Sequence, residues 1–377
     1  MFFDYETLRV IWWVLIGVLL IGFAIMDGFD LGVAMCLPWM TRTDSERRIL
    51  INTIGPTWEG NQVWFILGGG ALFAAWPMLY AVSFSGFYLA MLLVLLALIL
   101  RPVGFKYRSK LSNSTWRAVW DWALFIGGFV PALIFGVAVG NVIQGVPYYI
   151  DDSLRVFYTG TFWGLLNPFA LSSGILSVLM LVMHGAFFIQ VKTEGLLQQR
   201  ARKTARVCAL LVIVLFVACG FWTFYKIDGY MITSYVPHDG PSNPLYKNVM
   251  LHAGAWFDNY RNYPLLTLVP ILSLVAAALA FIFARFAKTA FVLSALSVGT
   301  LIATVGVSMF PFILPSSSTP NVSLLVWDSS SSQLTLFIML IFTVILLPIV
   351  LAYTAWVYRV LRGKVTVESI SSNDSSY

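Results

Sequence analysis

The chain has 377 residues, of which 59% are hydrophobic and only 11% are charged. A soluble globular domain is excluded, because so few polar side chains could not cover its surface. The formal net charge of +6 does not indicate a nucleic-acid partner. The basic residues lie in short runs between apolar segments, where they set the orientation of a membrane protein. These features predict an all-α, polytopic membrane protein.

Nine apolar segments are long enough to cross a bilayer, which takes about 20 residues of helix. They cover residues 8–38, 58–76, 79–100, 119–142, 162–189, 207–225, 264–284, 290–310 and 334–357. We predict one membrane domain of nine helices over residues 1–364 and a short cytoplasmic tail at 365–377.

The connecting segments alternate in charge along the chain. Most of the 23 Lys and Arg residues fall in one alternate set, around residues 42–48, 101–117, 192–206, 285–288 and 359–364. The positive-inside rule places this set in the cytoplasm. The N-terminus is then outside and the C-terminus in the cytoplasm. This orientation requires an odd number of spans, and nine satisfies it.

The second predicted span begins with polar residues that are unfavourable in the hydrocarbon of a bilayer, namely Glu59, Asn61 and Gln62. A carboxyl group in hydrocarbon costs several kcal/mol unless it has partners or water. Glu59 and Gln62 are three residues apart, so they share a face of a helix. Either the helix carries polar chemistry inward from one membrane surface, or its polar end reaches out to the interface.

More ionisable groups are expected at the same end of the bundle. Asp27 and Asp30 share a face near the inner end of the first span, and Arg101 ends the third. Asp121 opens the fourth span from the same side. Arg101 and Lys110 are candidate partners for this whole set of acids. A chain of acids leading in from one side is what proton uptake needs. The alternative is a set of structural ion pairs that joins the first helices.

Histidine is scarce, since only His184, His238 and His252 occur and only His184 falls in a predicted span. A membrane haem b usually needs two axial ligands on facing helices, and no zinc or copper ligand set is apparent. Any redox cofactor is therefore expected on a partner. The three cysteines form no C-x-x-C pair and are expected to be buried, small hydrophobic residues.

A series of motifs covers the chain from end to end. They are D-G-F-D-L-G-V at 27–33, E-R-R-I at 46–49, W-E-G-N-Q-V-W at 58–64, G-G-A-L-F-A-A-W-P at 69–77, F-S-G-F-Y at 84–88, R-P-V-G-F at 101–105, N-P-F at 167–169, I-D-G-Y at 227–230, M-F-P-F at 309–312, W-D-S-S-S-S-Q-L-T-L at 327–336 and Y-T-A-W at 353–356. In these motifs the chain closely resembles subunit II of the bacterial cytochrome bd quinol oxidase.

The resemblance implies a nine-helix, haem-free subunit in the bacterial inner (cytoplasmic) membrane. Its partner, subunit I, carries two haems b and one haem d, and a small single-helix subunit often accompanies the pair. The complex oxidises quinol, reduces dioxygen to water and takes protons from the cytoplasm, so it builds a proton gradient without pumping. Subunit II stabilises subunit I and contributes to the proton route. In some members it also holds a structural quinone, which makes ubiquinone a candidate ligand.

The resemblance also carries roles onto residues. The acid of the proton route falls on Glu59, where many relatives have Asp, and Asp27, Arg101 and Lys110 match polar positions on or near that route. We add Asp30, Asn61 and Gln62 to this candidate proton path. Lys106 departs from the family pattern, in which relatives place Asp. One further residue, Trp64, matches an aromatic residue near a proposed oxygen path.

The residues alone leave two other functions open. The first is a secondary transporter or proton channel that uses the acids of the first two spans for coupling, although no inverted repeat is evident. The second is a membrane scaffold for the haem subunit, in which the acids only hold helices together.

Overall fold

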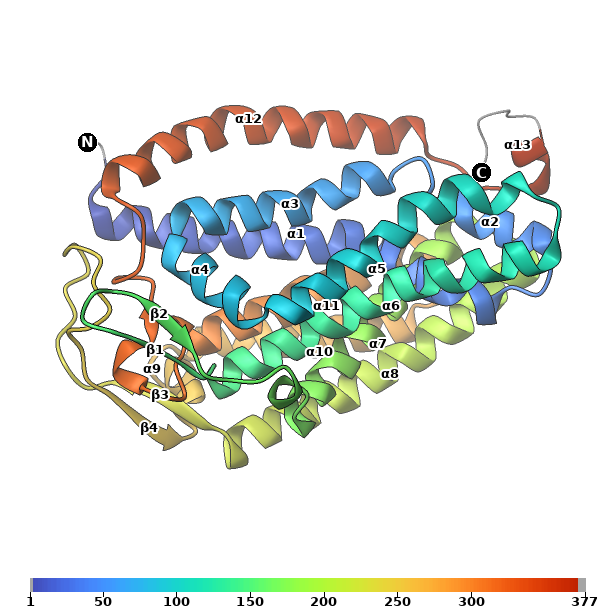
Figure 1. Cartoon of the computed structure of the whole chain (residues 1–377). Coiled ribbons are helices and arrows are strands. Elements are labelled where there is room, and N and C mark those ends of the chain that lie inside the picture. The colour runs from blue at the N-terminus through green and yellow to red at the C-terminus, as the bar shows by residue number, and fades with distance from the viewer. Residues whose placement is uncertain (1–2, 372–377) are drawn as a thin grey trace.

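In a computed structural model, residues 3–371 are described, and they form an elongated bundle of helices (Figure 1). The long helices are α1 (Tyr5–Met40), α3 (Trp58–Ala75), α5 (Tyr88–Tyr107), α6 (Ser114–Gln144), α7 (Pro168–Lys192), α8 (Gly195–Lys226), α10 (Leu268–Ile282), α11 (Ala287–Met309) and α12 (Gln333–Val360). The shorter ones are α2 (Asp44–Ile54), α4 (Pro77–Gly86), α9 (Asp258–Asn262) and α13 (Val367–Ser371).

Among the described residues, 8 helices are long and apolar enough to cross a membrane, where the sequence predicted nine. They are Tyr5–Met40, Tyr88–Lys110, Ser114–Gln144, Pro168–Lys192, Gly195–Lys226, Pro264–Ile282, Ala287–Met309 and Gln333–Val360. The predicted span at 58–76 corresponds to α3, which has 18 residues. The polar residues at the start of α3 lower its mean hydropathy, so α3 is not among the 8. It nevertheless lies beside α1 in the bundle (Figure 1).

Several helices begin or end away from the bounds predicted for the spans. The predicted third span, 79–100, is interrupted at Phe87, where α4 ends and α5 begins. The fifth span starts at Pro168 and not at residue 162, because the Asn167 side chain caps the helix by accepting from the backbone N–H of Ala170. The sixth starts at Gly195, well before residue 207, because the basic segment ahead of the apolar run is also helical. Only residues 365–371 of the predicted tail fall within the described part of the chain.

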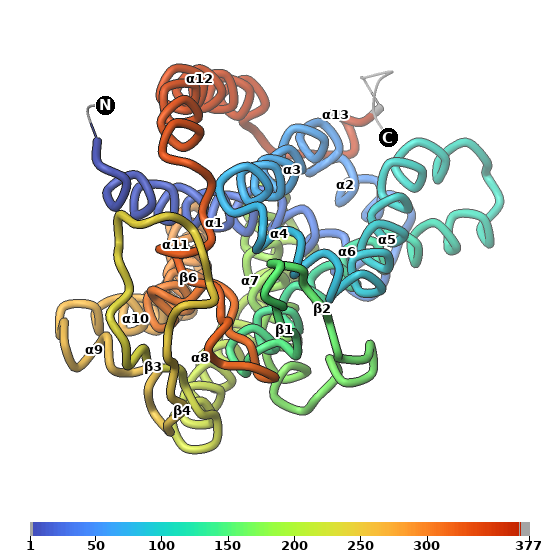
Figure 2. The backbone as a smooth tube through the Cα atoms, turned by 60° about the vertical axis from the view of Figure 1, so that its left-hand side comes forward, coloured from blue at the N-terminus to red at the C-terminus, as the bar shows by residue number. Residues whose placement is uncertain are grey.

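The fold is mainly α, but the all-α prediction missed three two-stranded sheets. In each sheet the two strands are antiparallel: β1 (Tyr148–Ile150) with β2 (Val156–Tyr158), β3 (Asp228–Ile232) with β4 (Val249–Ala253), and β5 (Phe312–Leu314) with β6 (Leu324–Leu325). These strands gather at the end of the bundle where α1 begins (Figure 2). The strands form an ordered cap over the helix ends. They lie in the connecting segments that contain few basic residues.

Two buried cations hold the cap together. The side chain of Arg9, at the start of α1, donates to Ser330 Oγ at 2.8 Å and to the carbonyl oxygen of Gly240 at 2.9 Å. The ammonium of Lys247 lies 2.7 Å from a carboxylate oxygen of Asp328. Burial raises the pKa of Asp328 and lowers the pKa of Lys247, because it disfavours the charged form of each group. The cap is therefore a packed structure rather than a set of open loops.

Helix α7 lies at the centre of the bundle and is its most buried span. It packs closely against α1, where Gly185 of α7 faces Gly32 of α1. A Cβ atom added at Gly185 would lie only 2.6 Å from the carbonyl carbon of Gly32. This glycine contact fixes the inner half of α1, which carries Asp27 and Asp30.

Candidate functional site

The most deeply buried charges form an ion pair between α1 and α5. Arg101 donates to both carboxylate oxygens of Asp27, at 2.8 and 3.2 Å. The two side chains are 0% and 1% exposed. A planar guanidinium matches a carboxylate in this paired geometry. The predicted proximity of Arg101 to the acids of the first span is confirmed, and its partner is Asp27.

A second chain of polar groups begins one turn further along α1. Asp30 accepts a hydrogen bond from the amide nitrogen of Asn61 at 2.7 Å, and the Asn61 oxygen accepts one from the Tyr358 hydroxyl at 2.8 Å. Asp30 and Asn61 are buried, whereas Tyr358 is partly exposed. The other carboxylate oxygen of Asp30 is buried without a hydrogen-bond partner. This polar chain joins α1, α3 and α12 and ends near the surface.

The remaining acid of the predicted path faces away from these groups. Asn61 and Glu59 are two residues apart on α3, which places them on opposite sides of the helix. Asn61 is 2% exposed, whereas Glu59 is exposed and Gln62 is half-buried. The outward face of α3 continues with Ile66 and Phe73, which are 66% and 59% exposed. The structure therefore brings Asp27, Asp30, Asn61 and Arg101 to one region and leaves Glu59 on an outer surface.

Lys110 and Lys106 are both exposed at the end of α5. The buried cation there is Arg108, which the sequence analysis missed. It donates to Asp121 at 2.5 Å and to Asp44 at 2.8 Å. Asp121 is thus paired with Arg108. Of the two cations expected beside the acids, Arg101 binds Asp27, and Lys110 has no carboxylate partner within the described residues.

The pairs around Arg108 extend into a network of five charges. Arg47 also binds Asp121, at 3.0 Å, and Arg117 binds Asp44, at 2.8 Å. No spacing in the sequence indicates these contacts, because they join α2, α6 and the turn after α5. The network closes the basic end of the bundle around these helices.

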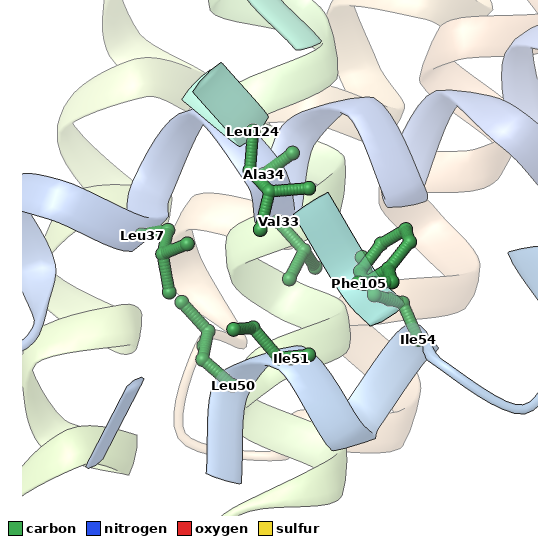
Figure 3. Close-up of a pocket in the computed structure, with 8 residues that line it drawn as sticks. All are labelled: Val33, Ala34, Leu37, Leu50, Ile51, Ile54, Phe105 and Leu124. Atoms are coloured by element: carbon green, nitrogen blue, oxygen red, sulfur yellow. The ribbon is translucent and has the colours of Figure 1, made fainter. Parts of the chain in front are cut away.

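An apolar layer separates this network from Asp27 and Asp30. Figure 3 shows the side chains of the layer around a small cavity. The volume of this cavity is about 10 Å³. The residues of the layer are Val33, Ala34, Leu37, Leu50, Ile51, Ile54, Phe105 and Leu124. On α5, Phe105 lies between Arg101 and Arg108. The cavity has room for about one water molecule and offers it no polar side chain, so the layer interrupts any polar route through the helices that form it.

His184 lies in the centre of the bundle and is fully buried. Its Nε2 donates to the carbonyl oxygen of Ile25 at 3.0 Å, and its Nδ1 lies 2.8 Å from Ser294 Oγ. The ring stacks on Phe291 with centroids 4.7 Å apart. Both ring nitrogens are engaged, so this arrangement does not fit a haem ligand. Among the described residues, no group of three His, Cys, Asp or Glu could hold a metal ion.

Trp64 lies on the inward face of α3 and packs against α1. It is 9% exposed, and a Cβ atom added at Gly22 would lie 2.5 Å from its ring. Its visible role is to fill the space between the two helices. The three cysteines are free and buried, as the sequence analysis predicted.

Comparisons with known proteins identify the family. The model of the family described as cytochrome bd terminal oxidase subunit II matches residues 8–361. The chain belongs to this family. It is therefore a subunit of a respiratory terminal oxidase and a membrane protein that crosses the bilayer several times.

Relatives of the family cover nearly the whole chain. The chain is 53% identical to cytochrome bd-I ubiquinol oxidase subunit 2 of Escherichia coli, over 99% of both sequences. It is 54% identical to a probable cytochrome oxidase subunit 2 of Haemophilus influenzae, again over 99% of both. The fold resembles a chain in the solved structure of bd oxidase from Geobacillus thermodenitrificans, with a TM-score of 0.67 and 16% identity, covering 94% of this chain and 99% of that one.

Proposed function

We propose that this chain is the haem-free subunit of a quinol-oxidising terminal oxidase and that it helps to bring protons from the cytoplasm to the site of dioxygen reduction. The relatives named as ubiquinol oxidase subunits support the reaction class. The engaged ring of His184 supports placing the haems, two of type b and one of type d, on subunit I. Ubiquinol is the proposed electron donor, and the gradient arises without pumping. The complex lies in the bacterial inner membrane.

The proposed contact face for subunit I is formed by α3 and α12. Helix α12 is the least buried span, and Leu336 is its only buried residue among those described. It lies beside α3, at the edge of the bundle away from α8 (Figure 1). A helix this apolar and this exposed needs either lipid or a partner to cover it. Its neighbour α3 carries the exposed Glu59 in its first turn, and lipid alone would not accommodate that carboxylate.

The observation that carries the proton proposal is therefore the outward position of Glu59 on α3. The apolar layer around Phe105 blocks a polar path through the helices of this chain that line it. A route along the outer surface of α3, closed by subunit I, avoids that layer. In this arrangement the Glu59 carboxyl takes up and passes on a proton at the seam between the two subunits, and Lys110 lies at the cytoplasmic end. In this proposal α3 is the ninth span, with the N-terminus outside and the C-terminus inside.

A scaffold function is the second candidate, and the ion pair of Asp27 and Arg101 favours it. Both side chains are buried and fully occupied with each other, which suits a fixed joint between α1 and α5. We assign this pair to assembly and assign Glu59 to proton transfer. A small single-helix subunit, a structural ubiquinone and membrane lipids complete the proposed complex.

The test is Glu59→Gln in the purified complex, with Glu194→Gln as the control. Both variants remove an exposed carboxylate while keeping its shape. We expect Glu59→Gln to lower dioxygen turnover at least tenfold with normal haem spectra, on the scale of losing a proton-transfer group. Glu194→Gln should leave turnover unchanged. Full turnover in Glu59→Gln would refute the proton role and leave scaffolding as the only candidate function. Loss of the haem absorption spectrum would instead assign Glu59 to assembly of the complex.

A further inference from the structure

A group of unpaired cations lies on α8 and around the turn between α10 and α11. Arg202, Lys203 and Arg206 are on the first turns of α8, while Arg285 and Lys288 are in and after the turn between α10 and α11. None of the five has a carboxylate partner within the described residues. Many other cations at this end are paired within the chain: Arg47, Arg108, Arg117, Arg200 and Lys364. This group, which we call the α8–α10 basic cluster, thus carries uncompensated charge.

Packing brings the two parts of the cluster together. The guanidinium carbon of Arg206 lies 4.5 Å from the centroid of the Phe281 ring on α10. The turn that follows Phe281 is held by Gln190 of α7, which donates to the carbonyl oxygen of Ala284 at 2.7 Å. The next residue, Arg285, is exposed. Arg206 and Arg285 therefore emerge from adjacent, fixed pieces of backbone.

Two further features suit an anion at this place. Helix α11 begins beside Arg285, and no side chain caps its N-terminus at Phe286. Its first backbone N–H groups are therefore free to bind an anion, and the helix dipole favours one. The Nε of Arg202, one turn before Arg206 on the same face, is buried without a hydrogen-bond partner. Like charges at this spacing repel each other, and a bound anion would relieve that repulsion.

Apolar surface continues directly from the cluster into the membrane region. The exposed residues are Val207, Leu210, Leu211 and Val214 on α8, and Ile282, Phe283 and Phe286 around the α10 end. A small soluble anion would not cover this apolar surface, whereas the acyl chains of a lipid would. We propose that the α8–α10 basic cluster binds the phosphate headgroup of an anionic phospholipid, with the acyl chains along α8 and α10.

The test measures lipid binding to the delipidated complex by native mass spectrometry, with phosphatidylglycerol and phosphatidylcholine as probes. The double variant Arg206→Gln/Lys288→Gln removes two cations of the cluster. The control double variant Arg42→Gln/Arg362→Gln removes two exposed cations elsewhere at the same end. We expect the unaltered complex to prefer phosphatidylglycerol, and the cluster variant to bind it about 30-fold more weakly, given the attraction of each basic residue near a lipid surface. The control should keep the preference.

Three results would overturn the proposal. One is equal retention of the two lipids by the unaltered complex. Another is the same loss in the control variant, which would make the preference an effect of total charge. The third is displacement of phosphatidylglycerol by inorganic phosphate at equal concentration, which would make the cluster a site for a soluble anion.

Discussion

Breaking the buried pair of Asp27 and Arg101 should destabilise the complex more than removing both charges together. In Asp27→Leu the guanidinium of Arg101 stays 0% exposed and loses both of its carboxylate contacts, which are 2.8 and 3.2 Å long. Removing one partner of a buried pair costs about 3–5 kcal/mol, because an uncompensated charge remains. At about 2 °C per kcal/mol for a chain of this size, the thermal midpoint should fall by about 6–10 °C.

The double variant Asp27→Leu/Arg101→Met tests this reasoning. Methionine keeps an unbranched stem at the place where a Cβ atom on Gly127 would lie 2.9 Å from Arg101 Cγ, so packing against α6 is retained. An apolar pair of similar volume is often neutral or stabilising. We expect the double variant to melt closer to the unaltered complex than either single variant does. Additive losses, with the double variant melting lowest, would show that the two charges do not depend on each other.

Two other substitutions test the packing and the surface charges. Hydrogen bonds from Arg200 hold the pKa of Glu46 below its ordinary value, so the stabilisation by Glu46 is present at neutral pH and is lost as pH falls through that lowered pKa. Glu46→Gln should therefore lower the thermal midpoint at pH 7 by the equivalent of at most about 1 kcal/mol, because the pair lies near the surface and solvent screens it. The difference between the variant and the unaltered complex should shrink below about pH 4, where Glu46 becomes protonated. A difference that stays constant with pH would contradict this cause. Gly185→Ala should destabilise the bundle by about 1–3 kcal/mol, because its Cβ atom would lie 2.6 Å from the α1 backbone. Gly220→Ala is the matched control, since nothing lies within 4 Å of its Cβ position, and equal midpoints for the two alanine variants would refute the close contact.

The sequence predicted the membrane class and most of the spans, and it showed which connecting segments carry few basic residues, because hydropathy and charge are read directly from the chain. It did not predict the interruption at Phe87, where an apolar run continues through a change of helix direction. It missed the β-strands because they are at most five residues long and lie in loops rich in Gly and Pro.

The sequence predicted which residues make up the candidate site, but it did not predict which of them face the interior of the bundle. Helical spacing shows that Asn61 and Glu59 lie on opposite faces of α3, but only packing against α1 decides which face is inward. The partner of Arg101 was expected among the acids of the first span, and it lies there. Arg108 was missed because its partners, Asp44 and Asp121, come from separate helices, and no local pattern encodes such a contact.

Dioxygen turnover of the Asp27→Leu/Arg101→Met complex, measured beside Glu59→Gln, tests most directly whether protons travel along the outer face of α3. If they do, the double variant should keep turnover within about twofold of the unaltered complex, while Glu59→Gln should lose at least about tenfold. Loss of turnover in the double variant with normal haem spectra, together with full turnover in Glu59→Gln, would place the route through the interior of this chain and contradict the account.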